Sequence, residues 1–208
     1  MRSALTFEAG APESRNPGVA TRAGATGCQP VLLNQIAISG NQSFAAADAV
    51  VLALWLDDLR NVIPQEAHLL DGKVVVDPSN PVGFDGNGQI FRTLPDEQSA
   101  GSIVAALLPA GSHYVKAFGT LAADSLAASA NREPHRAALF YATDDDIAAT
   151  TVEHLIRVAG FDPLKAGGVT DTGRIEGPSG ALSQFGLDGE IIDLEHARTA
   201  LAGANRLA

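Results

Sequence analysis

The chain has 208 residues, which is enough for one large domain or for one domain with a small appendage. Hydrophobic residues make up 46% and charged residues 18%, so the composition favours a folded chain over a disordered one. With 14 basic and 24 acidic residues the net charge is −10, which argues against nucleic acid or an anionic membrane surface as a partner.

Cysteine usage indicates the compartment. Cys28 is the single cysteine, so no disulfide can form within the chain, and it is expected to be a small buried residue. We expect no metal site, because one cysteine and five scattered histidines do not make a ligand set. No secretory signal and no apolar stretch of about 20 residues is visible. The sequence therefore predicts a cytoplasmic protein without a membrane span.

The elements expected from the sequence alternate between strands and helices after an irregular start. Residues 4–7 are expected to form a short strand, and residues 9–18 a turn-rich loop. The later elements are a strand over 49–54, a helix from Asp57, a strand over 73–77, a loop over 80–95, a helix over 99–108, strands over 114–118 and 137–142, a helix from Asp144 or Asp145 to Gly160, a short strand near 161–164 and a helix over 191–201. This order predicts an α/β fold with a mostly parallel sheet and helices on both faces.

Three strand ends of this sheet should lie side by side. Ligands of parallel sheets bind at the carboxyl ends of the strands, so the residues that follow each strand are the informative ones. Here they offer the Trp55 indole, the Asn80 amide, the Thr120 hydroxyl and few titratable groups. That set suits a flat, polar cofactor better than acid–base hydrolysis. The simpler alternatives are that Trp55 is a core or rim aromatic, that 77–81 is an ordinary turn, and that Thr120 caps a helix.

Residues 71–81, DGKVVVDPSNP, resemble a characteristic stretch of the NADPH:coenzyme F420 oxidoreductase-like family. The segments 99–101, 115–121, 137–145, 159–163 and 174–176 are similar to those that follow in that family, in the same order, so that the resemblance covers about residues 44–184. It implies a Rossmann-type NADP-binding domain over 1–130, incomplete at its start, and a smaller C-terminal lobe over 131–208 packed on it.

The resemblance also implies the chemistry. NADP(H) would lie across the strand ends beside a deazaflavin, coenzyme F420, or a similar hydride partner, and no catalytic acid–base residue would be needed. The cofactor-binding residues implied are Arg15, Leu54, Trp55, Asn80, Pro81, Ala117, Phe118 and Thr120.

The sequence departs from the family in three ways. No strand followed by Gly-x-Gly-x-x-Gly and a helix is present, so the first βα unit is expected to be missing and the chain to be truncated, with residues 5–7 as the second strand. The family often has Ser-Arg or Arg after its second strand to hold the 2′-phosphate. Ser14-Arg15 would serve here in one register, and a register anchored on residues 5–7 puts Gly10 at that position instead. Gly119 stands where the family commonly has Asn, which would remove a hydrogen bond near the nicotinamide.

Three functional hypotheses remain. The first is an NADP-dependent, deazaflavin-linked oxidoreductase. The second is an inactive member that acts as a binding or interaction module, and the third is a reductase of another small substrate on the same scaffold. Because a missing central strand would leave backbone unpaired, the chain should be less stable than its relatives or form a homodimer that covers the gap.

Overall fold

The structure is a computed structural model, and it describes residues 4–8 and 47–206. Its centre is a six-stranded sheet with the order β1-β2-β3-β6-β7-β8, and a two-stranded hairpin stands apart from it. The elements are β1 Ala4–Glu8, β2 Ala49–Ala53, α2 Leu56–Gln65, α3 Ala67–Leu70, β3 Val74–Asp77, β4 Val82–Phe84, β5 Ile90–Arg92, α4 Ala100–Leu107, β6 His113–Ala117, α5 Ala123–Ser129, β7 Ala138–Ala142, α6 Asp146–Val158, β8 Asp162–Gly167, the 3-10 helix η1 Val169–Ile175 and α7 Leu194–Ala204.

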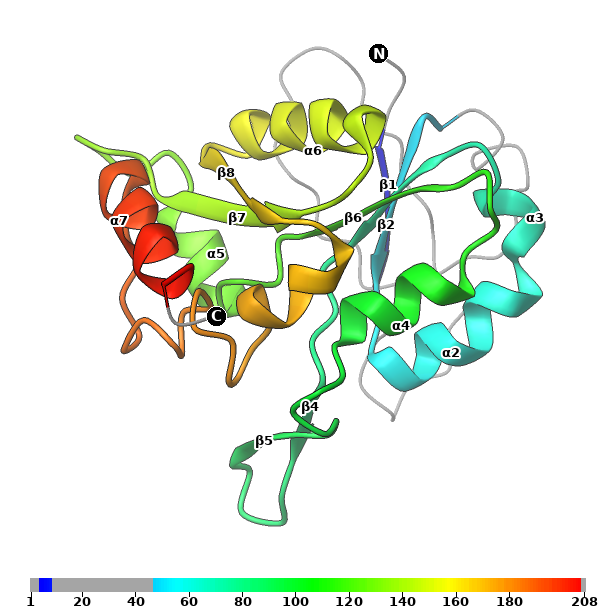
Figure 1. The fold of residues 1–208 in the computed structure, drawn as a ribbon, viewed down its shortest axis with the longest axis horizontal. Coiled ribbons are helices and arrows are strands. Elements are labelled where there is room, and N and C mark those ends of the chain that lie inside the picture. Colours follow the sequence, from blue (N-terminus) through cyan, green and yellow to red (C-terminus); the bar gives the residue numbers. More distant parts are fainter. Residues whose placement is uncertain (1–3, 9–46, 207–208) are drawn as a thin grey trace.

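The sheet is mostly parallel, as the alternation of strands and helices predicts. Only the β6–β7 pair is antiparallel, while β1–β2, β2–β3, β3–β6 and β7–β8 are parallel. Figure 1 shows α6 on one face of the sheet and α2 and α4 on the other. The fold class expected from the sequence, a Rossmann-like α/β sheet covered on both faces, is confirmed.

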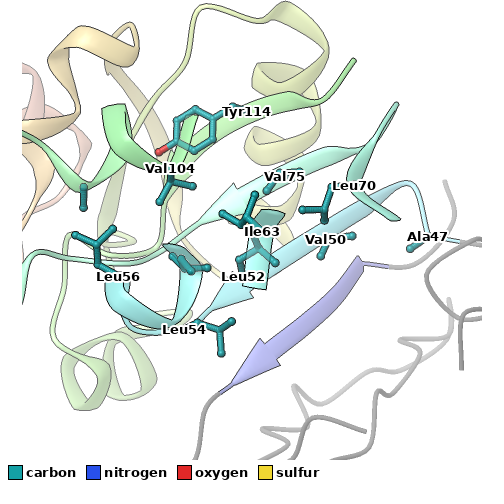
Figure 2. Packing of buried hydrophobic residues seen from close by; sticks show 12 residues of the cluster. Ala47, Val50, Leu52, Leu54, Leu56, Ile63, Leu70, Val75, Val104 and Tyr114 are labelled. Carbon is teal, nitrogen blue, oxygen red and sulfur yellow. The ribbon is translucent and has the colours of Figure 1, made fainter. Parts of the chain in front are cut away.

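The first face of the sheet packs against α2 and α4. In α2 the buried residues Leu56, Leu59 and Ile63 recur at helical spacing, so one stripe of this helix faces the sheet. Figure 2 shows this cluster, in which Val50 and Val75 from the strands meet the helical side chains. Burial of such a continuous apolar layer is the main stabilising term for the domain.

The second face packs against α6, the clearest helix of the sequence. Ala148, Val152 and Ile156 are buried against the strands. The Asp145 side chain caps this helix by accepting a hydrogen bond from the Ala148 N–H, and the chain after the helix turns at Gly160 with φ +92. The expected cap and the expected terminal glycine of this helix are both confirmed, and so is the Ser99 cap of α4.

The structure differs from the expected chain organisation in the loop after β3. The loop expected over 80–95 contains the hairpin β4–β5; its strands of three residues are too short for a periodicity signal. β7 and β8 belong to the same sheet as β6, so the sheet crosses the expected boundary after residue 130, and the division into a domain and a lobe stays a prediction.

The start of the chain contributes a strand to the edge of the sheet. β1 pairs directly with β2 in a parallel register from Ala4 and Ala49 to Glu8 and Ala53, so β2 has a neighbour on each side. The sheet therefore shows no gap at β2 for a second copy to cover. The expectation of a missing first βα unit depends on residues outside the described ranges and stays a prediction, as do Gly10, Ser14, Arg15 and Cys28. Of the helices that are described, none is long and apolar enough to cross a bilayer.

Candidate functional site

The carboxyl ends of β2, β3 and β6 form one edge of the sheet. These three strands are adjacent and parallel, so their last residues point the same way. The expected site residues follow directly: Leu54 and Trp55 after β2, Asn80 and Pro81 after β3, and Ala117, Phe118 and Thr120 at the end of β6. The structure therefore places all the expected residues along this edge except Arg15, which lies outside the described ranges.

Asn80 joins three segments at this edge. Its Nδ2 donates to the Gly119 carbonyl at 2.8 Å, and its Oδ1 accepts from the Gly177 N–H at 3.0 Å. A Cβ atom at Gly119 would lie 2.4 Å from the Pro78 carbonyl oxygen, so no side chain fits there. Asn80 thus connects the ends of β3 and β6 by a hydrogen bond. Both the nitrogen and the oxygen of its side-chain amide are hydrogen-bonded within the protein.

The segment after β6 has two features that an ordinary loop does not need. Phe118 has φ +66, a left-handed conformation that costs a bulky residue about 1–3 kcal/mol. Thr120 is 4% exposed, and its Oγ1 has no hydrogen-bond partner among the described residues. Strained backbone and unpaired buried polar atoms concentrate at functional sites, where a ligand supplies the missing partner.

The residues after β2 differ from each other in exposure. The Leu54 side chain is buried in the core cluster, whereas Trp55 is 48% exposed. The Trp55 ring meets Phe84 of the hairpin edge to face, with ring centres 6.1 Å apart and planes at 86°. Trp55 is therefore a rim aromatic that links the end of β2 to the hairpin.

A buried cluster of charged groups lies behind this edge. Lys116 Nζ is 3.0 Å from Oδ2 of Asp77 and 3.5 Å from Oε1 of Glu176, and all three side chains are almost fully buried. Lys116 also donates to the Ser79 carbonyl, and Asp77 accepts from the Ser79 N–H at 2.8 Å. These contacts fix the turn that presents Asn80.

Two further groups complete the cluster. The Tyr114 hydroxyl donates to Asp77 Oδ2 at 2.8 Å; burial, and next the Asp77 charge, raise the pKa of this tyrosine, which keeps it a donor. Glu176 accepts from the Ala100 N–H at 3.0 Å and the Gly101 N–H at 2.7 Å, the first amides of α4. The positive end of this helix is therefore neutralised from within the protein.

Sequence reasoning missed this cluster, although a signal was present. Asp77 ends the otherwise apolar β3, Lys116 is next to last in the mostly buried β6, and the two are direct register partners. A charged residue in a strand buried on both faces needs a partner of opposite charge. The third member, Glu176, comes from a distant segment and had no such signal.

The described helices offer little to a pyrophosphate group. The first turn of α2 carries Asp57 and Asp58, the start of α4 is occupied by Glu176, and α6 begins at Asp145 and Asp146. Anions bind at helix N-termini only where the amides are accessible and no carboxylate is in the way. A phosphate-binding segment would have to come from residues outside the described ranges.

The described residues hold no alternative site near this edge. No group of three or more His, Cys, Asp and Glu side chains is arranged to hold a metal ion within them. A hollow of about 390 Å³ near the starts of β7, β8 and α7 contains none of the expected residues; it is lined by Pro134, His135, Arg136, Asp162, Asp193, Leu194, Glu195 and Arg198.

Comparison with solved structures supports the fold. A hypothetical protein from Sinorhizobium meliloti is similar with a TM-score of 0.62 and 27% identity, over 77% of this chain and 73% of that one. A proposed F420-dependent NADP reductase from Arthrobacter sp. FB24 is similar with a TM-score of 0.55 and 23% identity, over 66% of this chain and 62% of that one. No protein-family model and no curated protein matches the sequence. The chain thus has the Rossmann-like fold of these proteins.

Proposed function

We propose that this protein is an NADP(H)-dependent oxidoreductase, and that it passes a hydride between NADP(H) and a deazaflavin of the coenzyme F420 type. The observation that carries the proposal is the end of β6 at the carboxyl edge of the parallel strands. There Phe118 has a strained backbone, and the Thr120 hydroxyl has no hydrogen-bond partner within residues 4–8 and 47–206. In parallel α/β sheets this edge is where cofactors bind. The similarity to a proposed F420-dependent NADP reductase supports the fold that such chemistry uses.

The described residues fit the nicotinamide end of such a cofactor. Thr120 supplies a buried hydroxyl that lacks a partner among them, and the amide of a nicotinamide both donates and accepts hydrogen bonds. The partly buried Phe118 supplies apolar surface beside it, whereas Ala117 is buried in the core cluster. The phosphate end has no counterpart among the described helix starts, so Arg15 remains the proposed ligand of the 2′-phosphate.

The nicotinamide ring itself supplies the transferable hydride. The chain's own residues then have to orient the reacting rings and exclude water, which needs no acid–base pair. This agrees with the charges behind the edge: Lys116, Asp77 and Glu176 are engaged with one another and with backbone groups. Their arrangement keeps the β3 and β6 ends in a fixed relationship, which is a positioning role.

The alternative function is that of a binding module that keeps the fold without catalysis. The observation that favours it is the set of carboxylates at the starts of α2, α4 and α6, which would repel a phosphate group. The two proposals differ in turnover: an enzyme oxidises NADPH in the presence of a deazaflavin, and a module does not.

The test follows the absorbance of NADPH with the deazaflavin as acceptor. Thr120→Val should lower kcat/KM about tenfold, the effect of one lost hydrogen bond of roughly 1.4 kcal/mol. Thr120→Ser keeps the hydroxyl and should retain the activity. If the 208-residue chain gives no turnover with the deazaflavin, the enzyme proposal is wrong.

A further inference from the structure

The hairpin β4–β5 extends away from the body of the molecule, as Figure 1 shows. It is well formed: the Asp85 carboxylate accepts from the N–H groups of Asn87 and Gln89, each at 2.8 Å, at its tip. At its base the Thr93 N–H donates to the Pro81 carbonyl at 2.8 Å. A two-stranded hairpin on its own is only marginally stable in water, so a third strand would stabilise this one.

Large apolar side chains cover both faces of the hairpin. Phe84 is 57% exposed, and its cross-strand partner Ile90 is 43% exposed on the same face. Phe91, 48% exposed, lies on the other face over Gly83. Single exposed apolar residues are common on protein surfaces, but a cluster of them indicates an interaction site.

The outer edge of β5 is suited to pairing with another strand. The hairpin's ladder bonds fall at Pro81–Thr93 and at Asp85–Gln89. Antiparallel ladders alternate, so the backbone groups of Ile90 and Arg92 point away from β4. Within the described residues, the backbone N–H groups of Ile90 and Arg92 donate no hydrogen bond to a loop, a turn or a side chain. Such an edge is a template for a further strand.

We propose that β5 pairs with β5 of a second copy of this chain, antiparallel about a two-fold axis. Ile90 then pairs with Arg92 of the partner subunit, and Phe91 lies opposite Phe91 of the partner subunit. This register uses every residue of β5 and every outward backbone group of Ile90 and Arg92. The two hairpins become one four-stranded sheet.

The neutral charge of the hairpin favours a second copy of this chain as the partner that binds its edge. The chain carries a net charge of −10, so most of its surface repels another copy. Residues 82–92 hold one acidic residue, Asp85, and one basic residue, Arg92, so the hairpin is neutral. Two copies can therefore meet at their hairpins without the repulsion that an acidic face would cause.

The available area predicts how strong the dimer is. Edge-to-edge pairing brings the β5 side chains of Ile90 and Phe91 beside the partner subunit. A large side chain buries roughly 150–250 Å², so these two half-exposed side chains offer roughly 200 Å² per copy. A typical stable complex buries about 800 Å² per partner. The hairpin dimer is therefore a reversible one that depends on protein concentration.

The first test measures the mass of the full chain by sedimentation over a dilution series. We expect a monomer–dimer equilibrium in the micromolar range and a shift to monomer in Phe91→Asp. Ile147→Asp is the matched control, because Ile147 is an exposed side chain on α6 (57%) and the substitution adds the same charge. Monomer at every concentration, or a dimer that survives Phe91→Asp, would overturn the proposal.

The second test examines the register by disulfide formation in a Cys28→Ser background. Opposite residues of a non-hydrogen-bonded antiparallel pair have Cα atoms about 4.5 Å apart, within disulfide reach. Phe91→Cys should therefore cross-link two copies under mild oxidation, and Ile147→Cys should not. A dimer in which Phe91→Cys gives no cross-link would contradict the β5 pairing.

Discussion

Lys116 and Asp77 are opposite each other on the parallel strands β6 and β3, and Lys116 Nζ lies 3.0 Å from Asp77 Oδ2 with both side chains buried. The strand register brings the two residues together, and Glu176 joins them from the segment after η1. The cluster thus ties the sheet to a part of the chain that is distant in sequence. It also fixes the turn that carries Asn80, and with it the edge of the sheet where we place the cofactor.

Lys116→Met should lower the free energy of unfolding by about 3–5 kcal/mol, because it leaves the carboxylates of Asp77 and Glu176 buried without a cation. Chemical denaturation measures the change. Arg60→Met is the control: Arg60 pairs with Asp57 at 3.0 Å on the surface, and loss of such a pair should cost less than about 1 kcal/mol. Similar losses in the two variants would mean that the buried cluster is not the stabilising feature we infer.

Gly119→Ala should lower the free energy of unfolding by about 1–3 kcal/mol, because the new Cβ would lie 2.4 Å from the Pro78 carbonyl oxygen. The matched variant is Gly86→Ala in the hairpin tip, where a Cβ meets nothing within 4 Å. That variant should change the stability by less than about 0.5 kcal/mol. Thermal unfolding measures the stability of both variants. Equal unfolding midpoints for Gly119→Ala and Gly86→Ala would contradict the expected clash at Gly119.

At Phe118 the usual preference for alanine over glycine should be reversed. The residue has φ +66, which glycine adopts without strain, so Phe118→Gly should be more stable than Phe118→Ala by about 1 kcal/mol. At the exposed helical position His154 the order should be the normal one, with alanine more stable by about 1 kcal/mol. Denaturant unfolding of the four variants gives both differences, and an alanine preference at both positions would exclude strain at Phe118.

Much of the fold was predictable from the sequence, and the reasons are local. The strands that end at Ala53, Asp77 and Ala142 consist almost entirely of apolar residues. In α6, between Asp145 and Gly160, the apolar residues recur with a clear helical period. The hairpin β4–β5 was not predictable, because strands of three residues carry no periodicity.

Less of the candidate site was predictable. The adjacent strand ends followed from the order of the elements, and the structure places Asn80 and Thr120 there. The contact of Asn80 with Gly177 and the contact of Lys116 with Glu176 join residues far apart in the sequence. Such contacts depend on tertiary packing, which no local pattern reports.

The ion pair of Glu153 predicts a pH dependence. The hydrogen bond from Tyr141, and next the one from Arg157, lower the pKa of the Glu153 carboxyl from its ordinary 4.5. The folded state therefore binds this proton less tightly than the unfolded state, and the stabilisation is present above pH 4.5 and lost as pH falls through the lowered pKa. Glu153→Gln should be less stable than the wild type at neutral pH, and the difference should shrink in acid; a constant difference in unfolding free energy would contradict this.

Calorimetric titration of NADPH into the 208-residue protein measures whether the carboxyl edge of β2, β3 and β6 binds NADP(H), as we propose. NADH titrated alongside reports what the 2′-phosphate contributes. We expect saturable micromolar binding of NADPH, about tenfold weaker in Thr120→Val and unchanged in Thr120→Ser. Absence of saturable binding, or equal affinity in Thr120→Val, would contradict this proposal.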